Sequence, residues 1–150
     1  MKTMNPLIFV ATFFFSGMAL SGDLEVEHYS SHPDMQLPFS DAVRVGNMLY
    51  LSGKIGNIPG TRDLAEGGIA GETRQALENI KGSLEKYGSS MGEVVKCTVF
   101  LADIAEWAAM NEVYKTYFAV DPPARSALGS SGLALNARVE IECFAALRPE

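Results

Sequence analysis

The chain has few of the residues from which metal centres, disulfide scaffolds and nucleic-acid surfaces are built. It contains two cysteines, two histidines and one tryptophan, and its 12 basic residues are outnumbered by 18 acidic ones. Two cysteines are too few for the framework of a disulfide-rich domain. A formal net charge of −6 also disfavours a surface that neutralises phosphates, so we expect no nucleic-acid partner.

The N-terminus has the pattern of a cleaved export signal. Lys2 provides a positive start, residues 7–20 form an apolar run, and Ala-Leu-Ser at 19–21 is typical of a signal-peptidase site. This run is shorter than the roughly 20 apolar residues that span a bilayer, so cleavage is favoured over a membrane anchor. We therefore expect a signal peptide over residues 1–21, a periplasmic or secreted mature chain, and no membrane attachment after cleavage.

The remainder of the chain is sufficient for one domain with a sizeable core. Residues 22–36 are polar and turn-rich, and we interpret them as an arm that leads into a domain over residues 37–150. His28 and His32 lie in this arm at a spacing that could place two metal ligands together on a helix. Because the arm does not look helical, we predict no metal site.

The spacing of apolar residues in the domain predicts five strands and two helices. The expected strands cover residues 43–45, 48–52, 94–101, 125–129 and 138–147, and the expected helices cover residues 69–87 and the segment between Asp103 and Pro122. This β-β-α-β-α-β-β order implies one mixed sheet with both helices packed on one face. The other face needs a cover, and self-association is the economical solution.

Both cysteines lie inside apolar segments that are expected to be strands. Buried free thiols are the favoured interpretation of Cys97 and Cys143. A cross-strand disulfide remains open if the two strands are neighbours.

Four separated stretches of the domain carry a shared signature. They are Pro38-Phe39-Ser40 followed by residues 45–53, residues 95–103, the pattern Trp107-x-x-x-Asn111-x-x-Tyr114-x-x-Tyr117-Phe118, and Pro123-Ala124-Arg125-Ser126 followed by residues 139–142. In order and spacing they resemble the RidA/YjgF family, over about Pro38 to Leu147. The resemblance implies a chorismate-mutase-like α/β (α+β) fold and a homotrimer with clefts between subunits. It also implies hydrolysis of 2-imino acids, such as 2-iminobutanoate or 2-iminopropanoate, to 2-keto acids and ammonia without a cofactor.

The resemblance assigns four candidate catalytic residues. Arg125 matches the family arginine that binds the substrate carboxylate, and Ser52 matches the serine beside it. Asn111 and Glu140 match two further positions of the cleft. A guanidinium can hold a carboxylate through two parallel hydrogen bonds, and a glutamate can act as general base toward the attacking water. The strand pattern alone does not separate Glu140 from Glu142, because residues two apart lie on one face.

Two further positions of the expected substrate pocket depart from the family pattern. Phe39 stands where a tyrosine is common, and Ala127 stands where many members have a reactive cysteine. These departures keep an alternative open, namely a trimer of the same family that binds small carboxylates or acts as a chaperone without catalysis. Ribonuclease activity, attached to some family members, is least favoured because the acidic chain lacks a basic aromatic patch.

Overall fold

A computed structural model describes residues 25–31, 34 and 37–148. The predicted signal peptide, and the part of the arm that contains His32, therefore lie outside the described residues. Among the helices of the described part, none is long and apolar enough to cross a membrane.

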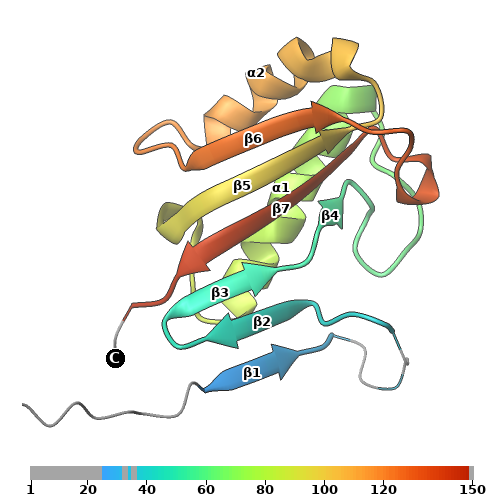
Figure 1. Ribbon diagram of the computed structural model, residues 1–150. Coiled ribbons are helices and arrows are strands. Elements are labelled where there is room, and N and C mark those ends of the chain that lie inside the picture. Colours follow the sequence, from blue (N-terminus) through green and yellow to red (C-terminus); the bar gives the residue numbers. More distant parts are fainter. Residues whose placement is uncertain (1–24, 32–33, 35–36, 149–150) are drawn as a thin grey trace, which may run out of the picture.

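The described residues form one mixed sheet and two helices (Figure 1). In chain order the elements are β1 (Val26–Tyr29), β2 (Ala42–Val45), β3 (Met48–Leu51), β4 (Lys54–Ile55), α1 (Gly68–Lys86), β5 (Val94–Leu101), α2 (Trp107–Tyr117), β6 (Ala124–Gly129) and β7 (Val139–Ala146), with short 3-10 turns at Met91–Glu93, Ile104–Glu106 and Ala134–Asn136. The strands follow the order β1-β2-β3-β7-β5-β6, and β4 pairs with β7. The predicted fold class is thereby confirmed.

Two short strands were missed by the sequence analysis. β1 lies in the segment interpreted as an arm and pairs antiparallel with β2, so this part of the arm belongs to the sheet. β4 has only two residues and pairs with β7 beyond the end of β3. Neither segment is long enough to show a clear alternation of polar and apolar residues, which is the signal that sequence analysis requires.

The two faces of the sheet differ in what covers them. Val139, Ile141, Cys143 and Ala145 of β7 are buried, whereas the residues between them are only half-buried. Helix α1 contacts β7 and β4, and Figure 1 shows both helices behind the sheet, with α2 near the β6 edge. We call the side that carries the buried residues the helix face and the other side the open face.

Helix α1 matches the predicted boundaries to within one residue at each end, but the start of α2 differs from the expectation. Asp103 caps the 3-10 turn before the helix, since its carboxylate accepts a hydrogen bond from the Ala105 backbone N–H at 2.9 Å. Glu106 does not close a capping box and instead forms an ion pair with Arg138, which precedes β7. Helix α2 ends at Tyr117, well before Pro122. Glu106 therefore links the start of this helix to the residue before β7.

The favoured interpretation of the cysteines as free thiols is wrong. Cys97 and Cys143 form a disulfide between β5 and β7. The two strands are antiparallel neighbours, and the two residues are directly opposite in register, with a Cα–Cα distance of 4.1 Å. Both side chains also lie on the buried helix face, so the register itself brings the sulfurs together.

Candidate functional site

Arg125 is held by side chains from helix α2. Its Nη1 donates a hydrogen bond to Asn111 Oδ1 at 2.7 Å. The guanidinium carbon lies 4.6 Å from the centre of the Tyr114 ring and 5.7 Å from that of Trp107. We call these four residues the Arg125 cluster. A cation that lies above aromatic rings and is hydrogen-bonded to an amide has few orientations available. The Arg125 guanidinium is therefore held in position before any ligand binds.

Tyr114 contributes a second polar group to this cluster. The residue is 5% exposed, and within the described residues its hydroxyl has no hydrogen-bond partner. Burial raises the pKa of Tyr114 to about 12, although the positive charge of Arg125 acts in the opposite direction. The hydroxyl is therefore protonated at neutral pH. A buried hydroxyl without a partner costs stability, and such a group is common where a ligand binds.

A cavity of about 540 Å³ opens beside the Arg125 cluster. Arg125, Asn111 and Tyr114 line it together with Phe118 and the Pro122–Pro123 turn. A cavity of this size, with mixed polar and apolar walls, suits a small organic molecule. An anionic group is the expected partner of the arginine.

Glu140 lies in a different setting, near the start of β7. Any side chain at position 53 would collide with the Glu140 carboxylate, so Gly53 is required for the carboxylate to lie where it does. Burial raises the pKa of Glu140, and the neighbouring charge of Glu142 raises it further. A carboxylate with a raised pKa is a stronger base than an ordinary one, as general-base catalysis requires.

Ser52 follows β3 and directly precedes Gly53. Its hydroxyl donates a hydrogen bond of 2.6 Å to the Ser40 carbonyl, and its backbone N–H donates to Asp41 O at 3.0 Å. Because a hydroxyl has one proton, Ser52 cannot also donate to a substrate carboxylate in this arrangement. We call Glu140, Gly53 and Ser52 the Glu140 cluster.

Phe39 and Ala127 belong to different parts of the molecule. Phe39 directly precedes Ser40, whose carbonyl accepts the hydrogen bond from Ser52, and its side chain is 56% exposed. Ala127 lies on β6, two residues after Arg125, and packs against the core. Its methyl group leaves no nucleophile at that position.

The two clusters lie on opposite faces of the sheet. Arg125 is directly opposite Cys97 of β5, whose side chain is buried on the helix face. Glu140 is directly opposite Phe100, one of the residues that alternate with the buried ones. Since residues opposite each other in register project to the same face, one chain does not bring Arg125 and Glu140 into one site.

Residues 29–147 match the model of the family described as endoribonuclease L-PSP, to which the RidA/YjgF proteins belong. The chain belongs to the RidA/YjgF family. It is 44% identical over 108 residues to a RutC family protein of Pyrococcus horikoshii, covering 72% of this chain and 86% of that protein. It is 42% identical over 112 residues to the mouse 2-iminobutanoate/2-iminopropanoate deaminase, covering 75% of this chain and 83% of the mouse protein.

A solved RidA/YjgF structure supports the fold. The crystal structure of the YjgF gene product of Escherichia coli superimposes with a TM-score of 0.73 at 31% sequence identity. The alignment covers 81% of this chain and 99% of the Escherichia coli chain.

Sequence analysis of this RidA/YjgF protein missed the roles of three residues. Trp107, Tyr114 and Gly53 lie in the stretches that resemble the family, but none of them was given a role at the site. The spacing of Trp107, Asn111 and Tyr114 does place them on one side of a helix. The sequence pattern does not show that β6, which carries Arg125, lies against this side of the helix. Among the described residues, no group of three or more histidine, cysteine or acidic side chains is arranged to hold a metal ion.

Proposed function

We propose that the protein hydrolyses 2-imino acids of the 2-iminobutanoate and 2-iminopropanoate type to 2-keto acids and ammonia. The observation that carries the proposal is the Arg125 cluster, in which Asn111, Tyr114 and Trp107 orient a guanidinium at a cavity. The name of the mouse relative supports the imine substrate.

In the proposed reaction Arg125 binds the substrate carboxylate, and Glu140 activates water. The water oxygen bonds to the imine carbon while its proton passes to the Glu140 carboxylate. In the collapse of the resulting carbinolamine, Glu140 returns the proton to the nitrogen, the carbon–nitrogen bond breaks to release ammonia, and the hydroxyl proton passes to the Glu140 carboxylate as the keto group forms. Ammonia or solvent then takes this last proton, which restores the carboxylate. A protonated imine is already electrophilic, so these groups are sufficient for the reaction.

The proposed site requires a second copy of the chain, because Arg125 and Glu140 project to opposite faces. The open face carries apolar side chains that the single chain leaves partly exposed, among them Tyr50 at 39%, Val95 at 45% and Leu128 at 43%. Exposed apolar groups of this kind favour association with another surface. We propose a homotrimer in which the Arg125 cluster of one subunit faces the Glu140 cluster of the next.

We further propose that the protein is exported. The N-terminal pattern supports this, and so does the disulfide between Cys97 and Cys143, because disulfides persist in oxidising compartments. Intact-mass measurement of the protein recovered outside the cytoplasm should give an N-terminus at or near Gly22. An uncut chain in the cytoplasm would refute export.

The test of function is a coupled assay of the purified protein with freshly generated 2-iminobutanoate and 2-iminopropanoate. We expect the rate of 2-keto acid release to exceed the spontaneous rate and to depend on Arg125. If the protein binds 2-ketobutyrate through Arg125 but does not accelerate hydrolysis, the alternative of a small-carboxylate-binding protein replaces the deaminase. If neither binding nor turnover is seen, the assignment of the Arg125 cluster is wrong.

A further inference from the structure

A second cavity lies on the helix face, between α1, β4 and the residues before β2. Its volume is about 330 Å³, and most of its lining residues are of polar types, among them Asp41, Lys54, Ser83 and Lys86, with Gly82 between them. One water molecule occupies roughly 30 Å³ in the liquid, so the cavity has room for a molecule of several non-hydrogen atoms. The proposed deaminase reaction uses none of these residues.

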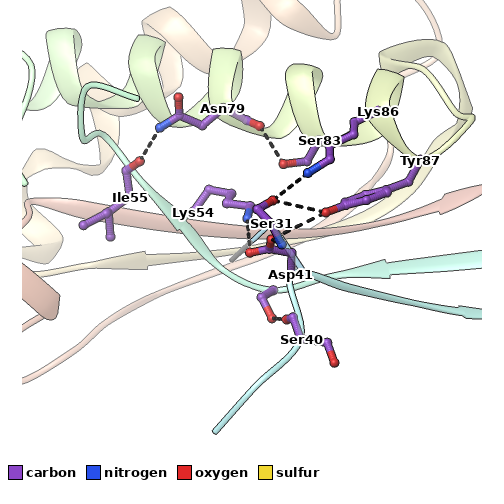
Figure 2. A network of polar contacts seen from close by, with 10 residues as sticks. Ser31, Ser40, Asp41, Lys54, Ile55, Asn79, Ser83, Lys86 and Tyr87 are labelled. Carbon is purple, nitrogen blue, oxygen red and sulfur yellow. Dashed lines mark hydrogen bonds and ion pairs between the residues drawn. The ribbon is translucent and has the colours of Figure 1, made fainter. Parts of the chain in front are cut away.

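Two ammonium groups approach this cavity from different elements (Figure 2). Lys54 comes from β4, and its Nζ lies 3.6 Å from Asp41 Oδ1, with the lysine side chain only 19% exposed. Lys86 comes from the last turn of α1, and its Nζ donates to Ser31 Oγ at 2.8 Å. Figure 2 shows Ser31 and Asp41 next to each other, so both cations are directed at the same small region.

The two lysines of this cavity differ in their partners. Asp41 is the acidic partner of Lys54, and Lys86 is bonded to a neutral hydroxyl. Burial alone would raise the pKa of Asp41, but hydrogen bonds from Ser31 and the charges of Lys54 and Lys86 outweigh it and lower the pKa. Glu78 also lines the cavity and keeps its negative charge while it accepts a hydrogen bond from Tyr117. Among the described residues, however, no carboxylate lies within ion-pair distance of the Lys86 ammonium, whose hydrogen-bond partner is Ser31.

The walls of the cavity are fixed by side-chain contacts to the backbone. Asn79 Nδ2 donates to Ile55 O at 3.0 Å and to Asn57 O at 2.9 Å, which ties the segment after β4 to α1. Ser83 Oγ donates to Asn79 O at 3.0 Å. At Gly82 an added Cβ would meet no atom within 4 Å, so the helix leaves open space at that position. The space is present without rearrangement of its surroundings.

This cavity is separate from both clusters described above. Lys54 is directly opposite Ile141, which is buried on the helix face, whereas Glu140 projects to the open face. The Arg125 cavity is lined by α2 and the turn before β6, and it shares no lining residue with the α1 cavity. A ligand could therefore occupy one cavity independently of the other.

We propose that the cavity between α1 and β4 is a binding site for a small molecule that carries a carboxylate or phosphate group. The anionic group would bridge Lys54 and Lys86 and give Lys86 a negatively charged partner. Lysine offers a compact charge with three donors rather than a planar fork, so it accepts either type of anion. Charge-assisted hydrogen bonds from the two ammonium groups would provide most of the affinity.

The test is thermal unfolding of the purified protein in sodium phosphate, sodium acetate or sodium chloride at equal ionic strength. A ligand that binds only the folded state raises Tm as its concentration rises. We expect phosphate, acetate or both to raise Tm saturably above the chloride value. Phosphate alone would identify a phosphate site, and acetate would extend the site to carboxylates. Equal Tm values in all three salts would overturn the proposal.

Four variants assign the effect to this cavity. Lys86→Met removes the unpaired cation, and Gly82→Leu fills the space without changing charge; each should weaken the apparent affinity for the anion by roughly tenfold or more. Lys81→Met is the matched control, because Lys81 is an exposed lysine of the same helix that does not line the cavity. Arg125→Met should also retain the anion effect. If Lys81→Met weakens binding equally, or Arg125→Met abolishes it, the site is not the α1 cavity.

Discussion

The Arg125 and Glu140 clusters differ in how completely their charged groups are satisfied. Arg125 has a hydrogen bond to Asn111 and two aromatic rings beside it. Glu140 has no hydrogen-bond donor among the described residues, is partly buried, and lies close to a second carboxylate. The first arrangement fixes a binding group in position, whereas the second makes a carboxylate basic by withholding partners from it. In the proposed reaction, binding and proton transfer require opposite environments, which the two faces of the sheet provide.

The structural link between the two clusters is the Cys97–Cys143 disulfide. Cys97 is paired in register with Arg125, and Cys143 lies on the strand that carries Glu140. A bridge with a sequence separation of 46 lowers the entropy of the unfolded chain and, in the chain-entropy description, raises its free energy by about 4 kcal/mol. We expect the double variant Cys97→Ala/Cys143→Ala to unfold at clearly lower urea concentration than the oxidised protein. A reductant should destabilise the original protein and leave the double variant unchanged; equal midpoints before and after reduction would contradict the bridge.

Removal of the proposed carboxylate-binding group, Arg125, should have the largest effect on catalysis. Arg125→Ala removes a charge-assisted contact to the substrate carboxylate, so kcat/KM should fall by roughly two orders of magnitude or more. Binding of 2-ketobutyrate, measured by calorimetry, should weaken in parallel. Asn111→Ala leaves the charge but frees the guanidinium, and should give a smaller loss. Undiminished turnover by the Arg125→Ala variant would show that Arg125 does not bind the substrate carboxylate.

Removal of the proposed general base, Glu140, should leave binding of the substrate carboxylate intact. Glu140→Gln keeps the size of the side chain but removes its basicity, so kcat should fall by roughly 10²-fold while 2-ketobutyrate still binds. The pKa of Glu140 is higher in the folded protein than in the unfolded chain, so folding favours the protonated side chain. The stability that protonated Glu140 contributes to the fold is complete below the unfolded pKa and is lost as pH rises through the folded pKa. Glu140→Gln should therefore match or exceed the original Tm at neutral pH. A large loss of 2-ketobutyrate affinity would show that Glu140 binds rather than activates.

A substitution at Glu142 should have a smaller effect, which is visible in the pH dependence of kcat/KM. The charge of Glu142 helps to raise the pKa of Glu140, so Glu142→Gln should lower that pKa. The acid limb of the kcat/KM profile should then move to lower pH, while the rate at neutral pH changes little. An acid limb that stays in place would exclude coupling between these two carboxylates.

The parts predicted from sequence were those with a long, regular pattern. The strand predicted over residues 138–147 matches β7, and the helix predicted over residues 69–87 matches α1, each to within one residue at either end. β1 was missed because Val-Glu-His-Tyr becomes a strand by pairing with β2, which no local pattern indicates. The disulfide required the register of two strands that are far apart in sequence.

The candidate site shows the same limit. Arg125, Asn111 and Glu140 were selected residue by residue through the family resemblance, and Arg125 and Asn111 do meet. The packing of Tyr114 under the guanidinium, and the use of the Ser52 proton by Ser40, depend on contacts between distant segments. Such contacts follow from the fold rather than from the spacing of residue types.

The central claim is that one active site combines the Arg125 cluster of one subunit with the Glu140 cluster of another. Its most direct test is to unfold Arg125→Ala and Glu140→Gln chains, refold them together in equal amounts, and measure imine hydrolysis. Random assembly of trimers would give about one site in four with both groups intact, so the mixture should recover about a quarter of the original activity. A mixture no more active than the two variants refolded separately would contradict the shared site.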